Sequence, residues 1–217
     1  MNKVVRIAID GPSGAGKSTI AKELAGKLNI DYIDTGAMYR ATGYKLLKEN
    51  TDINNEEELK RVLDSTEIDF SDGHIVLDGE IADSVIRTPE MAKQASICSA
   101  IGLVREKLVE LQRSMGTTKS VIMDGRDIGT NVFPDAEFKF YLVASPEVRA
   151  DRRHRELLEK GQTVEFSQVL EDIRARDHSD MTRKLNPLRK AEDAIEVNTD
   201  HMSIEEVTKY IYNIITK

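Results

Sequence analysis

The sequence has almost no cysteine and no long apolar segment. Its 217 residues include one cysteine, Cys98, so an internal disulfide is impossible, which fits a reducing compartment. No apolar run approaches the 18 residues of a membrane-spanning helix, and the chain passes from Met1 into a strand-like run without an apolar leader. We therefore expect a cytoplasmic protein without a membrane partner.

Repeats, low-complexity tracts and linkers rich in proline, glycine or serine are also missing from the sequence. The length is about 1.4 times that of a typical domain. Hydrophobic residues make up 40% of the chain and charged residues 32%, as in globular proteins. We expect a single domain, 1–217, divided into subdomains.

The net charge of −7 argues against a protein that coats nucleic acid. The arginines, however, are unevenly distributed, and eight of the 15 fall between Arg149 and Arg189. A local arginine cluster in an acidic protein suggests that a small anionic ligand binds there.

Buried strands alternate with amphipathic helices along most of the chain, which predicts βαβ units and a parallel sheet covered by helices on both faces. The predicted strands are Val4–Ile9, Ile30–Ile33, Ser120–Met123, Phe138–Val143 and Ala194–Val197, and the clearest helices are Lys17–Leu28 and Ile204–Ile215. The fold class is therefore α/β.

The segment 67–81 differs from this alternation of buried strands and helices, because its residues alternate between apolar and polar. Its turns would be Asp72-Gly73 and Asp78-Gly79, and Asp-Gly is a strong hairpin signal because both turn residues must reach positive φ. We predict a small antiparallel meander inserted between helices at about 54–65 and 89–114.

The most specific motif is a complete match to G-x-x-x-x-G-K-[S/T], which directly follows a buried strand and opens a helix. In this context the glycines allow backbone N–H groups to surround phosphate oxygens at a helix N-terminus. The sequence therefore predicts a P-loop that binds a nucleoside triphosphate, formed by Gly11, Pro12, Ser13, Gly14, Ala15, Gly16, Lys17, Ser18 and Thr19.

Two side chains of this loop have predicted chemical roles. Lys17, expected in a solvent-facing loop, would reach the β- and γ-phosphates, and the Ser18 hydroxyl would coordinate Mg²⁺. The base-reading motif of GTPases and the signature of transporter-type ATPases are both absent from the sequence. Arginines are abundant instead, and phosphoryl transfer depends on positioning and charge neutralisation.

Three further constellations suit phosphate-bearing substrates. Asp34–Arg40 begins a predicted helix with Thr35 as its N-cap, so a phosphate there would meet amides, a hydroxyl and a guanidinium. Arg126 and Asp127 follow a buried strand, at the sheet edge where open α/β folds bind ligands, although they could simply pair with each other. The segment 176–183 carries both charges at the end of a predicted helix.

Taken together, these motifs resemble those of bacterial cytidylate kinases, a family of P-loop nucleoside monophosphate kinases. The similarity runs from about residue 4 to beyond 190, and Thr-Gly-Ala-Met-Tyr-Arg combined with Asp-Gly-Arg-Asp-Ile-Gly is far more specific than the P-loop alone. The matching segments are Gly11–Ser18, Asp34–Arg40, Ile86–Glu90, Ala95-Ser96, Val104–Glu106, Asp124–Gly129 and Val132–Asp135.

The resemblance implies a parallel-sheet core at about 1–36, 117–147 and 164–217, a monophosphate-binding insert at about 37–116 that contains the small antiparallel sheet, and a mobile lid at about 148–163. It also implies residue roles. The acceptor phosphate would be held by Thr35, Arg40, Arg126 and Arg183; cytosine would be read by Ser96, Arg105 and Asp127; and the ribose would be contacted by Arg176 and Asp180. Lys17, Arg126, Arg183 and the lid residues Arg152 and Arg153 would be catalytic.

The function implied is transfer of the γ-phosphoryl of ATP to CMP or dCMP with Mg²⁺ as cofactor, in a protein expected to be monomeric. Two alternatives stay open at this stage. One is a P-loop kinase for another small acceptor such as UMP or dephospho-coenzyme A. The other is a nucleotide-dependent switch without turnover, against which the many arginines and the missing base-reading motif count.

Overall fold

The computed structural model describes residues 4–217, and their internal contacts divide the chain into two units. The first, here called the core unit, runs through Tyr32 and resumes from Thr118 to Lys217; the second, the insert unit, is Ile33–Thr117. The three-part division predicted from the sequence, with its separate lid, stays a prediction.

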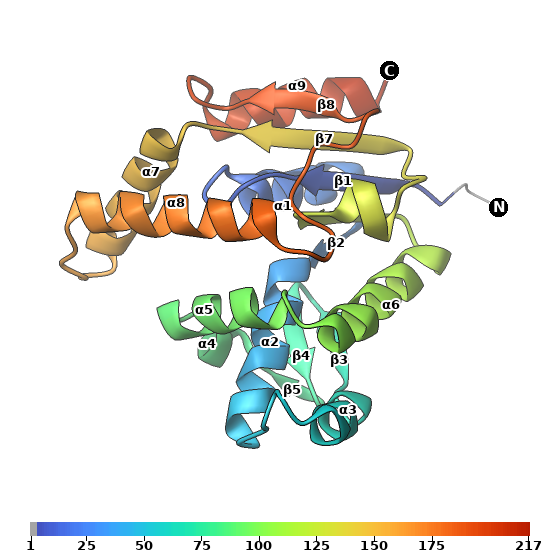
Figure 1. Ribbon diagram of the computed structural model, residues 1–217. Helices are drawn as coiled ribbons and strands as arrows, with labels where there is room; N and C mark the ends of the chain where they lie inside the picture. The colour runs from blue at the N-terminus through green and yellow to red at the C-terminus, as the bar shows by residue number, and fades with distance from the viewer. Residues whose placement is uncertain (1–3) are drawn as a thin grey trace. The chain divides into compact units, whose positions relative to one another are not determined.

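The core unit is built on a five-stranded sheet in the order β2-β6-β1-β7-β8 (Figure 1). The pairings of β1 with β6, β1 with β7 and β7 with β8 are parallel. The strands are β1 (Arg6–Asp10), β2 (Asp31–Asp34), β6 (Val121–Gly125), β7 (Phe138–Val143) and β8 (Ile195–Asn198). The predicted α/β class and parallel sheet are therefore confirmed.

Two helices of the core unit complete its main hydrophobic core. Helix α1 (Lys17–Leu28) and helix α9 (Ile204–Ile215) have the predicted bounds and pack against each other. Their inward residues, among them Ile20, Leu24 and Ile211, are buried with Ile7 and Phe140 of the sheet. This apolar layer holds β1 and α1 in place, and therefore the loop between them.

Helices α7 (Pro146–Glu159) and α8 (Phe166–Thr182) pack against each other through a smaller cluster, which includes Leu157 and Ile173. The turn between them contains Gly161, whose φ is +74°. A single π-helical turn, η1 (Ile128–Val132), follows β6. Such turns are rare and frequently occur at functional sites.

In the insert unit, β3 (Ile68–Ser71), β4 (His74–Leu77) and β5 (Glu80–Ile81) form the predicted antiparallel meander. Asp72-Gly73 and Asp78-Gly79 make the turns, and all four residues have positive φ, as predicted. The unit's helices are α2 (Thr35–Lys48), α3 (Glu56–Asp64), α4 (Asp83–Ile86), α5 (Pro89–Cys98) and α6 (Gly102–Thr118).

The single helix predicted at 89–114 is wrong, because α5 and α6 are separate helices. Ala100 and Ile101 donate their backbone N–H groups three residues back, to Ile97 and Cys98, which tightens and ends the first helix. The next helix begins at Gly102, a residue with weak helix propensity. The apolar periodicity of the two segments is similar, so periodicity alone did not separate them.

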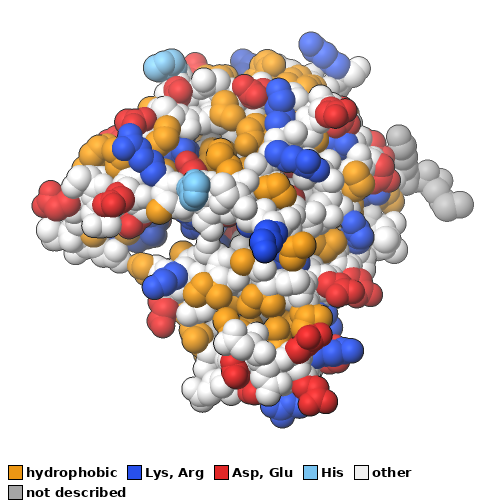
Figure 2. Space-filling view, in the orientation of Figure 1, with side chains coloured by type: hydrophobic (Ala, Val, Ile, Leu, Met, Phe, Trp, Pro, Cys, Tyr) orange, Lys and Arg blue, Asp and Glu red, His pale blue; other side chains and the backbone are white. Residues whose placement is uncertain are grey.

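Charged side chains of both signs are interspersed on the face drawn in Figure 2. Several charged residues of the chain pair with near neighbours in the sequence, for example Arg153 with Glu156 and Lys160 with Glu156. Exposed pairs of this kind contribute little to stability. No helix in residues 4–217 combines the length and the apolar character required to cross a membrane.

Candidate active site

The P-loop lies between β1 and α1 and has the backbone of an anion cradle. Gly11, Gly14 and Gly16 have positive φ. A Cβ at Gly11 would lie 2.2 Å from the Leu142 carbonyl oxygen, so only glycine fits there. Gly16 caps α1 without a side chain, so the first N–H groups of the helix are left to a ligand.

Lys17 is buried at the start of α1, and the expectation of a solvent-facing lysine is therefore wrong. Its Nζ atom turns back into the loop and donates to the Pro12 carbonyl at 2.8 Å, which leaves 5% of the residue exposed. Burial, with the nearby positive charge of Arg126, lowers the pKa of Lys17 to about 7. A phosphate at this position would favour the charged amine.

Ser18 forms a hydrogen bond with the carboxylate of Asp124, for which the sequence predicted no individual role. Its hydroxyl donates to Asp124 Oδ2 at 2.8 Å, and Tyr32 donates to Asp124 Oδ1 at 2.8 Å. Asp124 is buried near the end of β6, and β6 pairs with β1, which leads into the P-loop. The two oxygen groups suit Mg²⁺, which usually takes one or two protein ligands and completes its shell with phosphates and water.

A second carboxylate, Asp10, holds the backbone that follows the predicted base-reading residue. It accepts from the backbone N–H groups of Ile128 and Gly129 at 2.9 and 2.8 Å. Burial raises the pKa of Asp10 to about 6 although these two hydrogen bonds oppose the shift. Asp10 thus fixes the start of η1, directly after Asp127.

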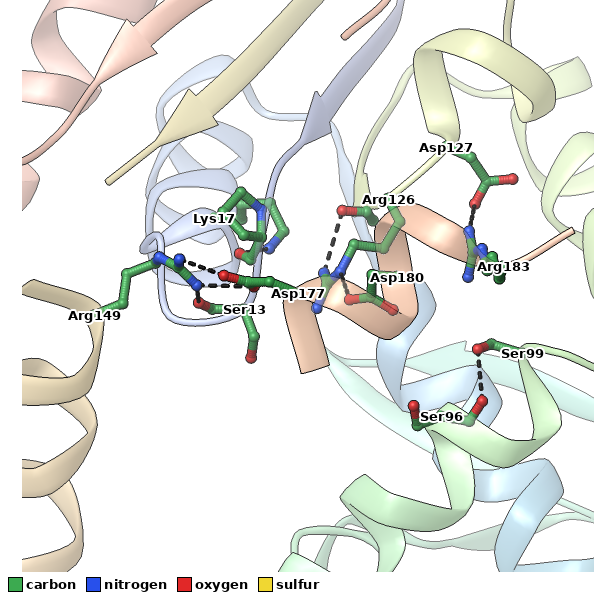
Figure 3. Close-up of polar contacts among 12 residues, drawn as sticks. Ser13, Lys17, Ser96, Ser99, Arg126, Asp127, Arg149, Asp177, Asp180 and Arg183 are labelled. Carbon is green, nitrogen blue, oxygen red and sulfur yellow. Dashed lines mark hydrogen bonds and ion pairs between the residues drawn. The ribbon is translucent and has the colours of Figure 1, made fainter. Parts of the chain in front are cut away.

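Arg126 and Asp127 do not pair with each other; each pairs with a residue near the end of α8 (Figure 3). Arg126 Nε donates to Asp180 at 2.7 Å, and Arg183 Nη2 donates to Asp127 at 3.1 Å. Burial opposes the charge on Arg126, but Asp180, Asp124 and Asp10 outweigh it and raise the pKa. The simple ion pair considered from the sequence is therefore excluded.

Asp180 keeps its charge in this buried position. Burial alone would raise its pKa, but Arg126, Arg176 and Arg183 lower it. Five of the sequence-predicted site residues are thus gathered around one end of α8, within the core unit: Arg126, Asp127, Arg176, Asp180 and Arg183.

The lid arginines differ in their surroundings. Arg152 Nη2 donates to the Thr199 carbonyl at 2.6 Å, and Arg153 pairs with Glu156 at 2.8 Å. Arg155 pairs with Asp151 on the same helix. Arg149, in contrast, is buried and pairs with Asp177 of α8. The predicted phosphate contacts of Arg152 and Arg153 therefore stay a prediction.

The insert unit carries the other predicted binding residues. Thr35 begins α2, but the N-cap is Asp34, whose carboxylate accepts from the Ala37 N–H at 2.8 Å. Asp34 also pairs with Arg40 at 3.1 Å. The prediction of Thr35 as the cap is thus wrong, since the carboxylate one residue earlier reaches the amide three positions on.

Ser96 and Arg105 lie in the α5 and α6 segments of the same unit. Ser99 donates its hydroxyl to the Ser96 carbonyl at 2.8 Å (Figure 3). Arg105 is buried, lies over the ring of Tyr39 and donates to the Ser99 carbonyl at 3.4 Å. The turn between the two helices therefore helps to place both residues.

The sequence of this chain is similar to those of known proteins. The family model described as cytidylate kinase matches residues 7–217. The chain belongs to the cytidylate kinase family. A cytidylate kinase of Clostridioides difficile (strain 630) is 52% identical over 205 residues, which cover 94% of this chain and 95% of that protein. A cytidylate kinase of Clostridium perfringens (strain SM101 / Type A) is 48% identical over 217 residues and the whole of both chains.

Among solved structures, an uncharacterized protein from Eubacterium ventriosum ATCC 27560 aligns over 99% of both chains with a TM-score of 0.54 and 15% identity. At that identity the likeness concerns the fold alone. The family assignment therefore rests on the full-length sequence similarity.

Proposed function

We propose that this protein transfers the γ-phosphoryl group of ATP to CMP or dCMP, giving ADP and CDP or dCDP. The observation that carries the proposal is the near 50% identity, over essentially the whole chain, to proteins named cytidylate kinase. The P-loop geometry, with its buried lysine and its serine–carboxylate pair, supports a nucleoside triphosphate as the donor.

On the donor side, the N–H groups of the P-loop and of the first turn of α1 bind the phosphates of ATP. Lys17 exchanges its bond to the Pro12 carbonyl for the β- and γ-phosphates and compensates charge on the transferring group. Because Lys17 is buried, its charge acts at low effective dielectric, where electrostatic stabilisation is strongest.

Mg²⁺ would be held by the Ser18 hydroxyl and by Asp124, directly or through water, together with phosphate oxygens. When bound, the ion would neutralise negative charge on the phosphates. No group of three or more His, Cys, Asp or Glu side chains within residues 4–217 is arranged as a metal cage, which agrees with a metal that arrives with its nucleotide.

On the acceptor side, the role of each residue is assigned from the family resemblance and from the charge of its side chain. Arg126 and Arg183 hold the acceptor phosphate together with Thr35 and Arg40, and Asp180 and Arg176 contact the ribose. Asp127 accepts a hydrogen bond from the cytosine amino group, and Ser96 and Arg105 bind the remaining polar edge of the base. Against the effect of burial, Asp180 raises the pKa of Arg126, and it orients the guanidinium before the anionic acceptor binds.

The lid arginines Arg152 and Arg153 complete the proposal. Each is held by a partner that a phosphate could replace, the Thr199 carbonyl for Arg152 and Glu156 for Arg153. Exchange of these partners for ATP phosphates would place positive charge on the transferring group and exclude water from it.

A coupled assay of ADP release tests the proposal. The protein is assayed with ATP and Mg²⁺ and with CMP, dCMP, UMP or no acceptor, and each reaction is repeated with EDTA in place of Mg²⁺. We expect turnover with CMP or dCMP, far less with UMP, and almost none without acceptor or without metal. Turnover with UMP equal to that with CMP, or ADP release independent of any acceptor, would contradict the proposal.

A further inference from the structure

Arg149 lies in the first turn of α7 and belongs to the arginine-rich segment predicted as a lid, yet it is buried. Its guanidinium bonds with three different segments of the core unit. Nε donates to the Ala144 carbonyl at 2.9 Å, and Nη1 donates to the Ser13 carbonyl of the P-loop at 3.0 Å. Nη1 and Nη2 also bind the two carboxylate oxygens of Asp177 (Figure 3).

The bond to Ser13 fixes one peptide of the phosphate cradle. The C=O and N–H groups of a planar trans peptide point in opposite directions, so a Ser13 carbonyl held by Arg149 sets the direction of the Gly14 N–H. Gly14 has a φ of +78°, and a Cβ at this position would lie 3.1 Å from Arg149 Cβ. Arg149 therefore contacts the loop through both its stem and its guanidinium.

Asp177 holds Arg149 in this orientation from α8. A bidentate arginine–carboxylate pair fixes the plane of the guanidinium, which a lysine cannot reproduce. Asp177 and Asp180 are three residues apart on α8, so they lie on one side of the helix, and Arg183 directly follows the last residue of the helix. Through these residues α8 contacts Arg149, Arg126 and Asp127 in turn.

We propose that Arg149 is a positioning residue for ATP: it acts through the Ser13 peptide to set the phosphate cradle, and Asp177 orients it from α8. The inference rests on the ATP site proposed above. The competing explanation is a purely structural ion pair, which only holds α7 against α8. A matched example of such a structural pair is Arg174 of α8 with Glu147 of α7, at 2.7 Å on the surface. Arg174 has no described bond to the P-loop.

The experiment compares Arg149→Lys, Asp177→Asn and the control Arg174→Lys in the full-length protein. Calorimetric titrations with ATP alone and with CMP alone give the two affinities, and thermal unfolding gives the stability of each variant. We expect Arg149→Lys to weaken ATP binding by about tenfold or more, because a charge-assisted bond that fixes the cradle is lost. Asp177→Asn should weaken ATP binding by about threefold to tenfold, while CMP binding changes little in either variant. Arg174→Lys should bind both nucleotides as the wild type does.

A purely structural ion pair predicts a different pattern of nucleotide affinities and unfolding temperatures. If Arg149→Lys unfolds at lower temperature but binds ATP as tightly as the wild type, or if it loses affinity for ATP and CMP equally, the positioning role is wrong. If Arg149→Lys does not fold, Asp177→Asn decides, since it retains the arginine and its bonds to the backbone. Unchanged ATP affinity in folded Asp177→Asn would overturn the inference.

The titration with ATP alone separates this inference from the proposed function. A wild-type protein that binds ATP but does not phosphorylate CMP would overturn the acceptor assignment and leave the role of Arg149 testable by the same variants. A wild-type protein that does not bind ATP would overturn the phosphate cradle and, with it, the positioning role.

Discussion

Asp127 and Arg183 form an ion pair with 3.1 Å between Oδ1 and Nη2, which joins the segment after β6 to the residue that ends α8. Asp127 Oδ2 also accepts from Asn131 Nδ2 at 3.1 Å. In the proposed mechanism one member of this pair reads the base and the other holds the acceptor phosphate. The pair therefore links recognition of the base to placement of the phosphate.

Asp127→Asn should narrow the preference for CMP over UMP. Cytosine presents an amino donor where uracil presents a carbonyl acceptor, so a carboxylate favours cytosine, whereas an amide can serve both. Loss of one charge-assisted hydrogen bond costs about 1.5–3 kcal/mol, so the ratio of kcat/KM values should fall by about tenfold or more. Steady-state kinetics with both acceptors measures the ratio, and an unchanged ratio would leave Ser96 and Arg105 as the base readers.

Lys17→Ala should fold normally and lose most of its turnover. The variant loses one hydrogen bond to the Pro12 carbonyl but also removes a buried amine, so we expect little change in the unfolding temperature. Loss of a buried charge that stabilises the transferring phosphoryl typically costs about 10²–10³ in kcat. Purified, folded Lys17→Ala with near-normal kcat would refute the role of Lys17.

ATP binding should take up a proton above neutral pH. Burial, followed by the charge of Arg126, lowers the pKa of Lys17 to about 7 in the free protein, and the triphosphate raises it again. At pH 8 most free Lys17 is neutral and gains a proton on binding; at pH 6 most is already charged and gains almost none. Calorimetric titration in buffers with different ionisation enthalpies measures the number of protons taken up for each ATP bound.

Lys17→Ala is the control for the proton measurement, because ATP itself titrates near neutral pH. The difference in proton uptake between the wild type and Lys17→Ala should be large at pH 8 and small at pH 6. A difference that is the same at both pH values would mean that the pKa of Lys17 in the free protein is not close to 7.

The segment 147–165 should become ordered when both nucleotides are bound. Its helix α7 is held to α8 by a small apolar cluster that includes Ala150, Leu157 and Ile173, and regions with few buried contacts open readily. Amide hydrogen exchange should slow strongly with a bisubstrate analogue and only partly with either nucleotide alone. Equal protection in the free and the doubly bound protein would indicate a static helix and would remove the lid roles of Arg152 and Arg153.

The sequence predicted the local elements well because their signals lie in a few neighbouring residues. The bounds of α1 and α9 match, and the Asp-Gly turns of the meander have the positive φ values that their composition demands. Errors occurred where two local signals competed. Asp34 caps α2 in place of Thr35, and the segment predicted as one helix over 89–114 breaks between Cys98 and Gly102.

The role of Asp124 could have been suspected from its place at the end of a buried strand, where a P-loop protein often has a metal-associated carboxylate. Its hydrogen bond with Ser18, which lies 106 residues earlier in the chain, could not have been predicted from the sequence. The burial of Arg149 could not be predicted either, because the sequence shows only that it belongs to a cluster of arginines and not which of them are exposed. Burial against the P-loop distinguishes it from Arg152 and Arg153.

The sequence by itself determined where the phosphate cradle lies, because the glycine-rich motif occurs between a buried strand and a helix. The tertiary structure alone decided which charges meet: Arg126 with Asp180, Arg183 with Asp127, and Arg149 with Asp177. Each of these pairs joins segments at least 28 residues apart. Charge pairing depends on distance in space and on exclusion of water, and both arise only when the strands and helices pack together.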